Sequence, residues 1–128
     1  MSPSQPGARP LVLVVDDDPE VLAMLGTALR HHGFAVALAP SGAEAVRLFR
    51  AGRADAVLCD VQMPGLDGPA TLQALRALDP AVRCVFMSGH SGRYAAEDLL
   101  GLGAAAVLDK PFRSLAELAG VLREVAGR

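Results

Sequence analysis

The sequence predicts an α/β fold, a five-stranded parallel sheet with helices on both of its faces. The first observation is that short apolar runs such as Leu11–Val15 lack polar alternation, which is typical of strands covered on both faces. The second is that segments with apolar residues at helical spacing separate these runs, and several begin with helix-capping residues. Regular alternation of strand and helix indicates parallel strands joined by right-handed crossovers.

The chain has the length and composition of one domain with an aliphatic core. Its 128 residues are 52% hydrophobic and 4% aromatic, which suits a single core and is too short for two. The net charge of -2 argues against a nucleic-acid-binding surface, and no apolar stretch approaches the ~18 residues of a membrane span. We therefore expect a soluble domain that binds neither nucleic acid nor membrane directly. Cys59 and Cys84 lie inside apolar runs and not at the spacing of metal ligands, which favours the cytoplasm as the compartment.

The first strand and helix carry the clearest local signals. The strand Leu11–Val15 ends in three consecutive aspartates, and Asp18 is expected to cap a helix that begins at Pro19 and ends near Gly33. Residues 1–10 contain three prolines and no apolar signal sequence. We therefore expect a flexible N-terminal arm over residues 1–10 and a folded domain over residues 11–128.

Four more strand and helix pairs follow in order. Capping boxes at Ser41 and Ser114 begin two of the helices, and Pro69 begins another after the turn-rich segment that follows Asp60. The predicted strands cover residues 34–38, 56–60, 82–87 and 104–108, and the predicted helices cover residues 41–51, 69–78, 94–100 and the segment that starts at 114.

Five strands in this alternation fit the flavodoxin-like, doubly wound order 2-1-3-4-5, with five helices. In this order the C-terminal ends of strands one, three, four and five lie side by side. These ends carry Asp16 and Asp17, then Asp60, then Ser88, then Lys110. We therefore expect polar side chains from four strand ends to meet at one edge of the sheet, where open parallel sheets bind ligands.

The residue types at this edge suggest phosphoryl chemistry. Three carboxylates that meet at one edge repel one another, so a divalent cation is expected to bind Asp16, Asp17 and Asp60. Oxygen ligands without histidine or cysteine favour Mg²⁺, with Mn²⁺ as the alternative. Lys110 is the only lysine among twelve basic residues, which suggests a site that needs a compact positive charge beside the metal. Taken singly, Asp60 could cap a strand, Ser88 could shape a turn and Lys110 could be a surface residue.

Four motifs point to a family. They are Val14–Glu20, Cys59–Gly68, Met87–Gly89 and Leu108–Phe112. Their order and spacing resemble those of the CheY-like receiver domain of two-component response regulators, and the resemblance covers the chain from about Leu11 to its end. It implies a phosphorylation-dependent signalling domain, either a stand-alone regulator or the receiver portion of a longer protein such as a hybrid kinase.

By this resemblance, Asp60 accepts a phosphoryl group from a histidine kinase or a histidine phosphotransfer protein. Asp16, Asp17 and Asp60 bind Mg²⁺ together with the backbone carbonyl of Gln62. The domain would catalyse only its own phosphorylation and dephosphorylation. It would then change its affinity for a downstream partner, or for a second copy of itself, at the face formed by the fourth helix, the fifth strand and the fifth helix.

The resemblance also assigns the switch hydroxyl to Ser88 and the phosphate-pairing ammonium to Lys110, and it implies a cis bond before Pro111. Two positions depart from the pattern of the family. Val107 stands where receivers usually carry an aromatic residue, and His90 stands at a variable position near the path of the hydrolytic water. Because Val107 is short and stiff at χ1, we expect the response to run through the loop of residues 88–92 and the start of the fourth helix near Tyr94, with little change at Val107.

An alternative from another class is a haloacid-dehalogenase-like phosphatase that uses Asp16 as its nucleophile. The triplet Asp16–Asp18 after a buried strand fits the Asp-x-Asp motif of that family. That family needs a further acidic pair after the lysine, whereas the separated Glu117 and Glu124 are the acids that follow it here. This alternative would also leave Asp60 without a role.

Overall fold

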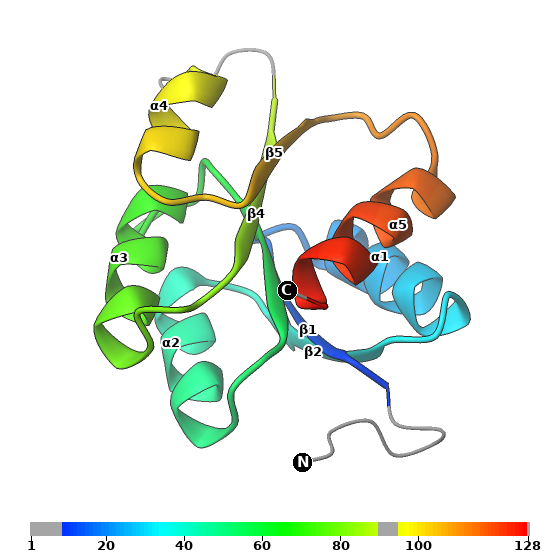
Figure 1. The fold of residues 1–128 in the computed structure, drawn as a ribbon, viewed down its shortest axis with the longest axis horizontal. Helices are drawn as coiled ribbons and strands as arrows, with labels where there is room; N and C mark the ends of the chain where they lie inside the picture. Colours follow the sequence, from blue (N-terminus) through cyan, green and yellow to red (C-terminus); the bar gives the residue numbers. More distant parts are fainter. Residues whose placement is uncertain (1–8, 90–94, 128) are drawn as a thin grey trace.

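The structure, a computed structural model, describes residues 9–89 and 95–127. Residues 1–8 of the predicted arm, His90 and Tyr94 lie outside the described residues. Five parallel strands form one sheet in the predicted flavodoxin-like order β2-β1-β3-β4-β5 (Figure 1). The strands are β1 (Leu11–Val15), β2 (Ala35–Ala39), β3 (Ala56–Asp60), β4 (Cys84–Ser88) and β5 (Ala106–Asp109), and the helices are α1 (Pro19–His31), α2 (Gly42–Ala51), α3 (Gly68–Leu78), α4 (Ala96–Gly101) and α5 (Leu115–Ala126).

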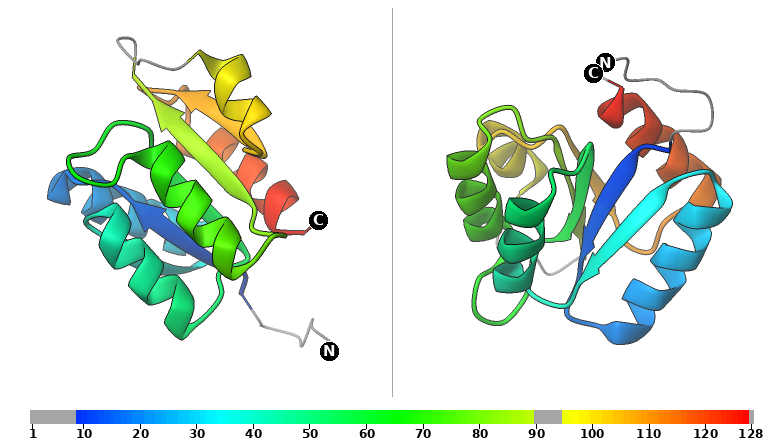
Figure 2. Two further views of the ribbon diagram at one scale, coloured as in Figure 1. Left: turned by 90° about the vertical axis from the view of Figure 1, so that its left-hand side faces the viewer. Right: turned by 90° about the horizontal axis from the view of Figure 1, so that it is seen from below.

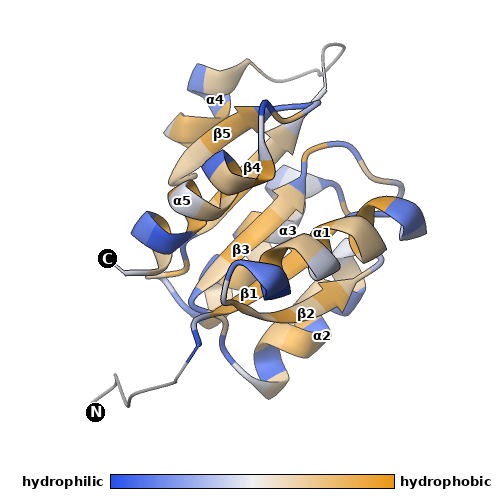
Figure 3. Cartoon of the chain, turned by 90° about the vertical axis from the view of Figure 1, so that its right-hand side faces the viewer, coloured by the Kyte–Doolittle hydropathy of each residue, from blue (hydrophilic) through white to orange (hydrophobic). Residues whose placement is uncertain are grey.

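Helices cover both faces of the sheet, which explains why the strands read as unbroken apolar runs. α1 and α5 pack on one face, and α2, α3 and α4 pack on the other (Figures 1 and 2). Successive strand residues alternate between two apolar clusters, so that Leu13 and Val57 face α2 and α3 while Val12 and Leu58 face α1 and α5. Every residue of β3 and β4 is buried, and the hydropathy colouring shows the apolar strands at the centre (Figure 3). The fold therefore fixes the ends of these two strands rigidly.

The strands β2, β4 and β5 begin one or two residues later than the sequence predicts, at residues 35, 84 and 106. Each also ends one residue later than predicted. At each late start, one amide within two residues of the strand closes the previous helix or turn and cannot join the sheet. The donors are Phe34, Ala104 and Val82, and their acceptors are the carbonyls of Leu29, Leu99 and Asp79.

The predicted N-caps are confirmed at Asp18, Ser41 and Ser114, while the carboxylate of Glu44, the second member of one predicted capping box, pairs with Arg47. The side chains of Asp18, Ser41 and Ser114 each accept a hydrogen bond from an amide in the first turn, over 2.9 to 3.1 Å. α3 begins at Gly68, one residue before the predicted start, because Asp67 provides the cap. Among the residues that the structure describes, no helix is long and apolar enough to cross a bilayer.

Candidate functional site

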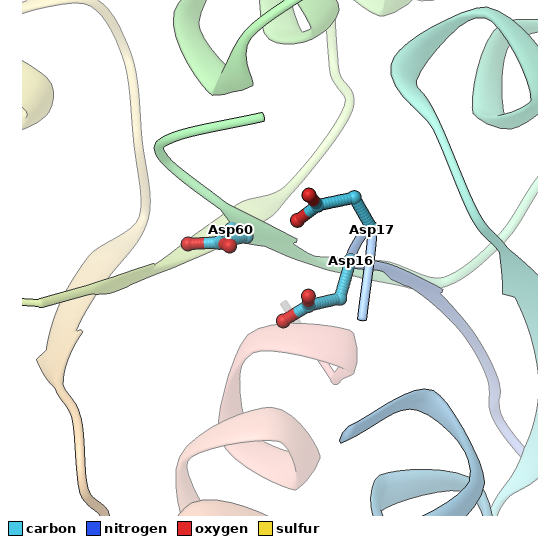
Figure 4. Close-up of side chains that lie close together, drawn as sticks. All are labelled: Asp16, Asp17 and Asp60. Carbon is cyan, nitrogen blue, oxygen red and sulfur yellow. The ribbon is translucent and has the colours of Figure 1, made fainter. Parts of the chain in front are cut away.

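Three carboxylates from two neighbouring strand ends form the centre of the site (Figure 4). Asp16 and Asp17 directly follow β1, and Asp60 is the last residue of β3. One carboxylate oxygen from each of the three lies within 4.8 Å of the other two. Asp16 is 1% exposed and Asp60 9% exposed, whereas Asp17 lies at the surface. The structure thus brings together the three acids that the sequence placed at the strand ends.

Lys110 joins this cluster from the end of β5. Its Nζ lies 3.2 Å from Oδ2 of Asp16 and 3.5 Å from Oδ2 of Asp60. The backbone amide of Lys110 donates to the carbonyl of Ser88 over 2.8 Å, which continues the β4–β5 pairing by one residue. The Lys110–Pro111 bond is cis, as the resemblance implies.

The charges in this cluster are unequally balanced. Burial raises the pKa of Asp60 above its ordinary value of 3.8, and the charge of Asp16 adds to this rise, while Lys110 and the backbone amide of Gln62 oppose it. Burial by itself would lower the pKa of Lys110, but the charges of Asp60 and Asp16 raise it above its ordinary value of 10.5. The lysine therefore stays charged at neutral pH, and the cluster favours additional positive charge.

Backbone groups hold two of the carboxylates in place. The amide of Asp18 donates to Oδ1 of Asp16 over 2.9 Å, so both oxygens of Asp16 have a donor, the second being Lys110. The amide of Gln62 donates to the Asp60 carboxylate. The sequence suggested a role for the carbonyl of Gln62, and the structure adds this role for its amide.

Gly68, the first residue of α3, supports the site from behind, a contribution that the motif alone did not indicate. Its amide donates to the carbonyl of Val61 over 2.8 Å and closes the loop that follows Asp60. A Cβ at this position would lie 2.6 Å from the carbonyl oxygen of Asp60 and 2.9 Å from the ring of Phe86. Glycine therefore allows α3 to begin directly against the end of β3.

Ser88 is the last residue of β4 and is 9% exposed. Asp60 pairs with Met87 in the sheet, so Ser88 lies one residue further along the neighbouring strand. Its hydroxyl donates to the carbonyl of Gly89 over 3.2 Å. Val107 is half-buried on β5 and packs against the apolar cluster under α2, α3 and α4.

An apolar groove of about 510 Å³ adjoins the site between α1 and the segment that follows Lys110. Lys110 itself is one of the residues that line the groove. The apolar lining is formed by Val21, Met24, Pro111, Phe112 and Leu115. Met24 is 45% exposed, so part of the apolar lining faces solvent.

The donor set fits a hard divalent cation. The three clustered side chains offer carboxylate oxygens, and the described residues of the cluster contribute no histidine or cysteine ligand. Mg²⁺ and Mn²⁺ prefer such oxygens and retain several water ligands, which the exposed side of Asp17 would admit. A site of this composition is also the kind in which a metal and an ammonium together neutralise a phosphoryl group.

Comparison with protein families gives one match that covers most of the chain. The model of the response regulator receiver domain matches residues 12–123. The transcriptional regulatory protein PrrA of Mycobacterium tuberculosis is 44% identical over 119 residues, which are 93% of this chain and 51% of PrrA. The transcriptional regulatory protein ZraR of Escherichia coli is 43% identical over 100 residues, 78% of this chain and 23% of ZraR. The chain thus spans about half the length of PrrA and less of ZraR.

Solved structures give the same fold. A response regulator from Chloroflexus aurantiacus superposes with a TM-score of 0.86 at 31% identity, over 94% of this chain and all of that one. The chemotaxis protein CheY4 of Vibrio cholerae superposes with a TM-score of 0.84 at 27% identity, over 92% of this chain and 99% of that one. The chain therefore belongs to the receiver-domain family of two-component response regulators.

Proposed function

We propose that Asp60 accepts a phosphoryl group from the phosphohistidine of a histidine kinase or a histidine phosphotransfer protein, and that this changes the affinity of the domain for a partner. The observation that carries the proposal is the position of Lys110, whose ammonium lies 3.2 Å from Asp16 and 3.5 Å from Asp60. A compact cation at this point can neutralise charge that develops on a phosphoryl group transferred to Asp60.

In the transfer, a carboxylate oxygen of Asp60 forms the new O–P bond and the N–P bond of the donor breaks. The released imidazole nitrogen takes up a proton from water. The ammonium of Lys110 contacts the phosphoryl oxygens, and the hydroxyl of Ser88 leaves the carbonyl of Gly89 to donate to one of them. The domain catalyses this transfer on itself alone, and later the hydrolysis of its own phosphoaspartate, in which water attacks phosphorus, the O–P bond to Asp60 breaks and inorganic phosphate leaves.

Asp16, Asp17, Asp60 and the carbonyl of Gln62 would hold Mg²⁺, or Mn²⁺ in its place. When bound, the cation neutralises charge on the phosphoryl oxygens. The side chains themselves orient one another, because the carboxylate of Asp16 is fixed by two donors and Lys110 spans Asp16 and Asp60.

The donor protein has to bring its histidine to Asp60, and the apolar groove beside Lys110 gives it a surface to bind. The proposed output surface is the face of α4, β5 and α5, where a downstream protein or a second copy would bind. The expectation that nucleic acid plays no part is not supported, because relatives such as PrrA and ZraR are named as transcriptional regulatory proteins. Regulation of transcription is the output that these names favour, and the cytoplasm stays the proposed compartment.

The phosphatase alternative with Asp16 as nucleophile is not supported by the family match. It also conflicts with the environment of Asp16, which is 1% exposed and has both oxygens engaged, by the amide of Asp18 and by Lys110. A nucleophilic oxygen needs a free approach for the substrate phosphorus. Asp60 has the more open carboxylate of the two.

Incubation with acetyl phosphate and Mg²⁺ tests the proposal. We expect one acid-labile phosphoryl group, detected by intact mass because the chain has no tryptophan for a quenching assay. Asp60→Asn should abolish the label, and the matched surface change Glu97→Gln should not. A label on Asp16, or continued turnover of acetyl phosphate by Asp60→Asn, would contradict the proposal and restore the phosphatase alternative.

A further inference from the structure

Arg76 connects the C-terminal ends of two helices. It lies in the last turn of α3, and its Nη1 donates to the carbonyl of Leu102 over 3.0 Å. Leu102 is the residue that follows α4, so its carbonyl belongs to the C-terminal end of that helix. Both helix ends carry partial negative charge, so one positively charged guanidinium can interact favourably with both.

Gly103 provides the space for this guanidinium. A Cβ at residue 103 would lie 1.7 Å from Nη1 of Arg76 and 3.0 Å from its Cζ. The backbone of Gly103 also has φ of +104°, which favours glycine independently of the space. Gly33 has a similar φ of +96° after α1 but has no atom within 4 Å of the corresponding Cβ position. The close approach of an arginine therefore distinguishes Gly103 from an ordinary helix-ending glycine.

The helix that Arg76 holds has few other attachments. α4 has six residues, of which Leu99 is buried, while Leu100 beyond it is 48% exposed. The residue before α4, Ala95, has no side chain that can cap the helix. Its N-terminal end is instead closed by a hydrogen bond of 3.1 Å from the Ala95 amide to the carboxylate of Asp98. The two ends of α4 are thus held differently, one within the helix and one by a side chain from α3.

We propose that Arg76 is a positioning residue that clamps the C-terminal end of α4, so that α4 moves by pivoting about that end. The side chain lies at the surface, away from Asp60, and acts through the carbonyl of Leu102. The inference rests on the proposed function in one respect, because phosphorylation of Asp60 is the event that would move α4. The clamp itself exists without phosphorylation and can be tested without it.

Amide hydrogen exchange without any ligand tests the clamp directly. The reporters are the amides of Leu102, Gly103 and Ala104, which donate to carbonyls of α4. In Arg76→Ala we expect their exchange to be about three- to tenfold faster, the range for a partly exposed hydrogen bond to a charged group. Arg50→Ala removes an exposed arginine of α2 and should leave these rates unchanged. Equal rates in the two variants would overturn the proposal.

A double-mutant cycle tests whether Arg76 and Gly103 act through one contact. In Gly103→Ala, the new Cβ meets the guanidinium of Arg76, which is the far end of a flexible side chain. The substitution should therefore displace the guanidinium as well as strain the backbone. In the wild-type background, Gly103→Ala should therefore lower the free energy of unfolding more than Gly33→Ala does. In the Arg76→Ala background, the two substitutions should lower it by about the same amount. Equal costs of Gly103→Ala in both backgrounds would contradict the clamp.

Beryllofluoride with Mg²⁺ serves as a stand-in for the phosphoryl group and tests the pivot. In the wild type, amide shifts should change over residues 95–98 and little over 100–103. In Arg76→Ala, the changes should extend through residue 103. Wild-type changes of equal size at both ends of α4 would refute the pivot. If no amide near Asp60 responds, the proposed function fails, and the exchange experiment still decides the clamp.

Discussion

Asp60 belongs to a cluster of three carboxylates whose negative charge one lysine does not neutralise. Three carboxylates lie within reach of a single cation, and the ion pairs of Lys110 are with Asp16 and Asp60. Because burial raises the pKa of Asp60, the folded protein holds a proton there more tightly than the unfolded chain does. Stability without metal should therefore fall as pH rises from 3.8 through the higher pKa of the folded state.

The first prediction is that Asp60→Asn stabilises the metal-free domain at pH 7, by about 1 kcal/mol or less. The amide side chain removes the ionised form whose burial is unfavourable. The difference from the wild type should shrink below pH 3.8, where Asp60 is protonated in both states. Urea unfolding followed by circular dichroism at several pH values measures this. A destabilised variant at pH 7 would mean that the Lys110 ion pair outweighs the cost of burial.

The second prediction separates metal binding from folding at Asp17. This residue is exposed, and the role proposed for it is that of a metal ligand. Asp17→Asn should weaken Mg²⁺ binding about tenfold or more, while the metal-free domain keeps or gains stability through reduced repulsion. Thermal melts with and without Mg²⁺ give both quantities. Equal destabilisation in the two conditions would show that Asp17 has a structural role and is no ligand.

At the scale of elements, the site depends on how tightly α3 follows β3. Gly68 begins α3 against the carbonyl of Asp60, and Gly42 begins α2 in similarly crowded space against Thr71 and Leu66. The two glycines differ in what they crowd. A Cβ at Gly68 would meet the backbone of Asp60, the proposed phosphoacceptor, whereas a Cβ at Gly42 would meet Leu66 and Thr71, which lie further along the chain from Asp60.

The third prediction uses these two glycines as a matched pair. Both Gly68→Ala and Gly42→Ala should destabilise the domain, by about 1 to 3 kcal/mol for overpacking. Gly68→Ala alone should also reduce labelling by acetyl phosphate at saturating Mg²⁺, by at least about tenfold, because the carboxylate of Asp60 is displaced with its backbone. Denaturant titration and intact mass measure the two effects. If the two folded variants are labelled to a similar extent, Gly68 does not position the carboxylate of Asp60.

At the scale of the whole molecule, the signal has to leave a site built on rigid, buried strands. One described segment with few buried residues is α4, in which Leu99 is buried and which follows β4 and Ser88 in the chain. Val107 is half-buried against the cluster under α2, α3 and α4, and its branched side chain has little rotamer freedom.

The fourth prediction concerns the route of the response. On addition of beryllofluoride and Mg²⁺, amide shifts should change at Ser88, Gly89 and the start of α4, with little change at Val107. His90 and Tyr94, which the sequence placed on this route, lie outside the described residues. Val107→Ala should leave the pattern of shifts unaltered. Changes confined to α1 and α3 would contradict this route.

The sequence by itself determined the order of the elements, the caps and the residues at the strand ends. Asp18, Ser41 and Ser114 cap helices through amides two or three residues away, so their signals are local and could be read directly. The proximity of the acids at the strand ends could also be predicted, because few sheet topologies are compatible with a regular alternation of strand and helix. Asp16 and Asp60 are therefore where the pattern placed them.

Only the tertiary structure decided contacts between residues far apart in the chain. The sequence predicted that Lys110 lies beside the acids, but the structure shows that its ammonium pairs with Asp16, 94 residues away in the chain. The hydrogen bond from Arg76 to Leu102, across 26 residues, had no signal in the sequence. The start of β5 depends on the amide of Ala104 closing α4 in place of joining the sheet. Such choices depend on the free energy of packing whole elements against each other, and no pattern of neighbouring residues records that energy.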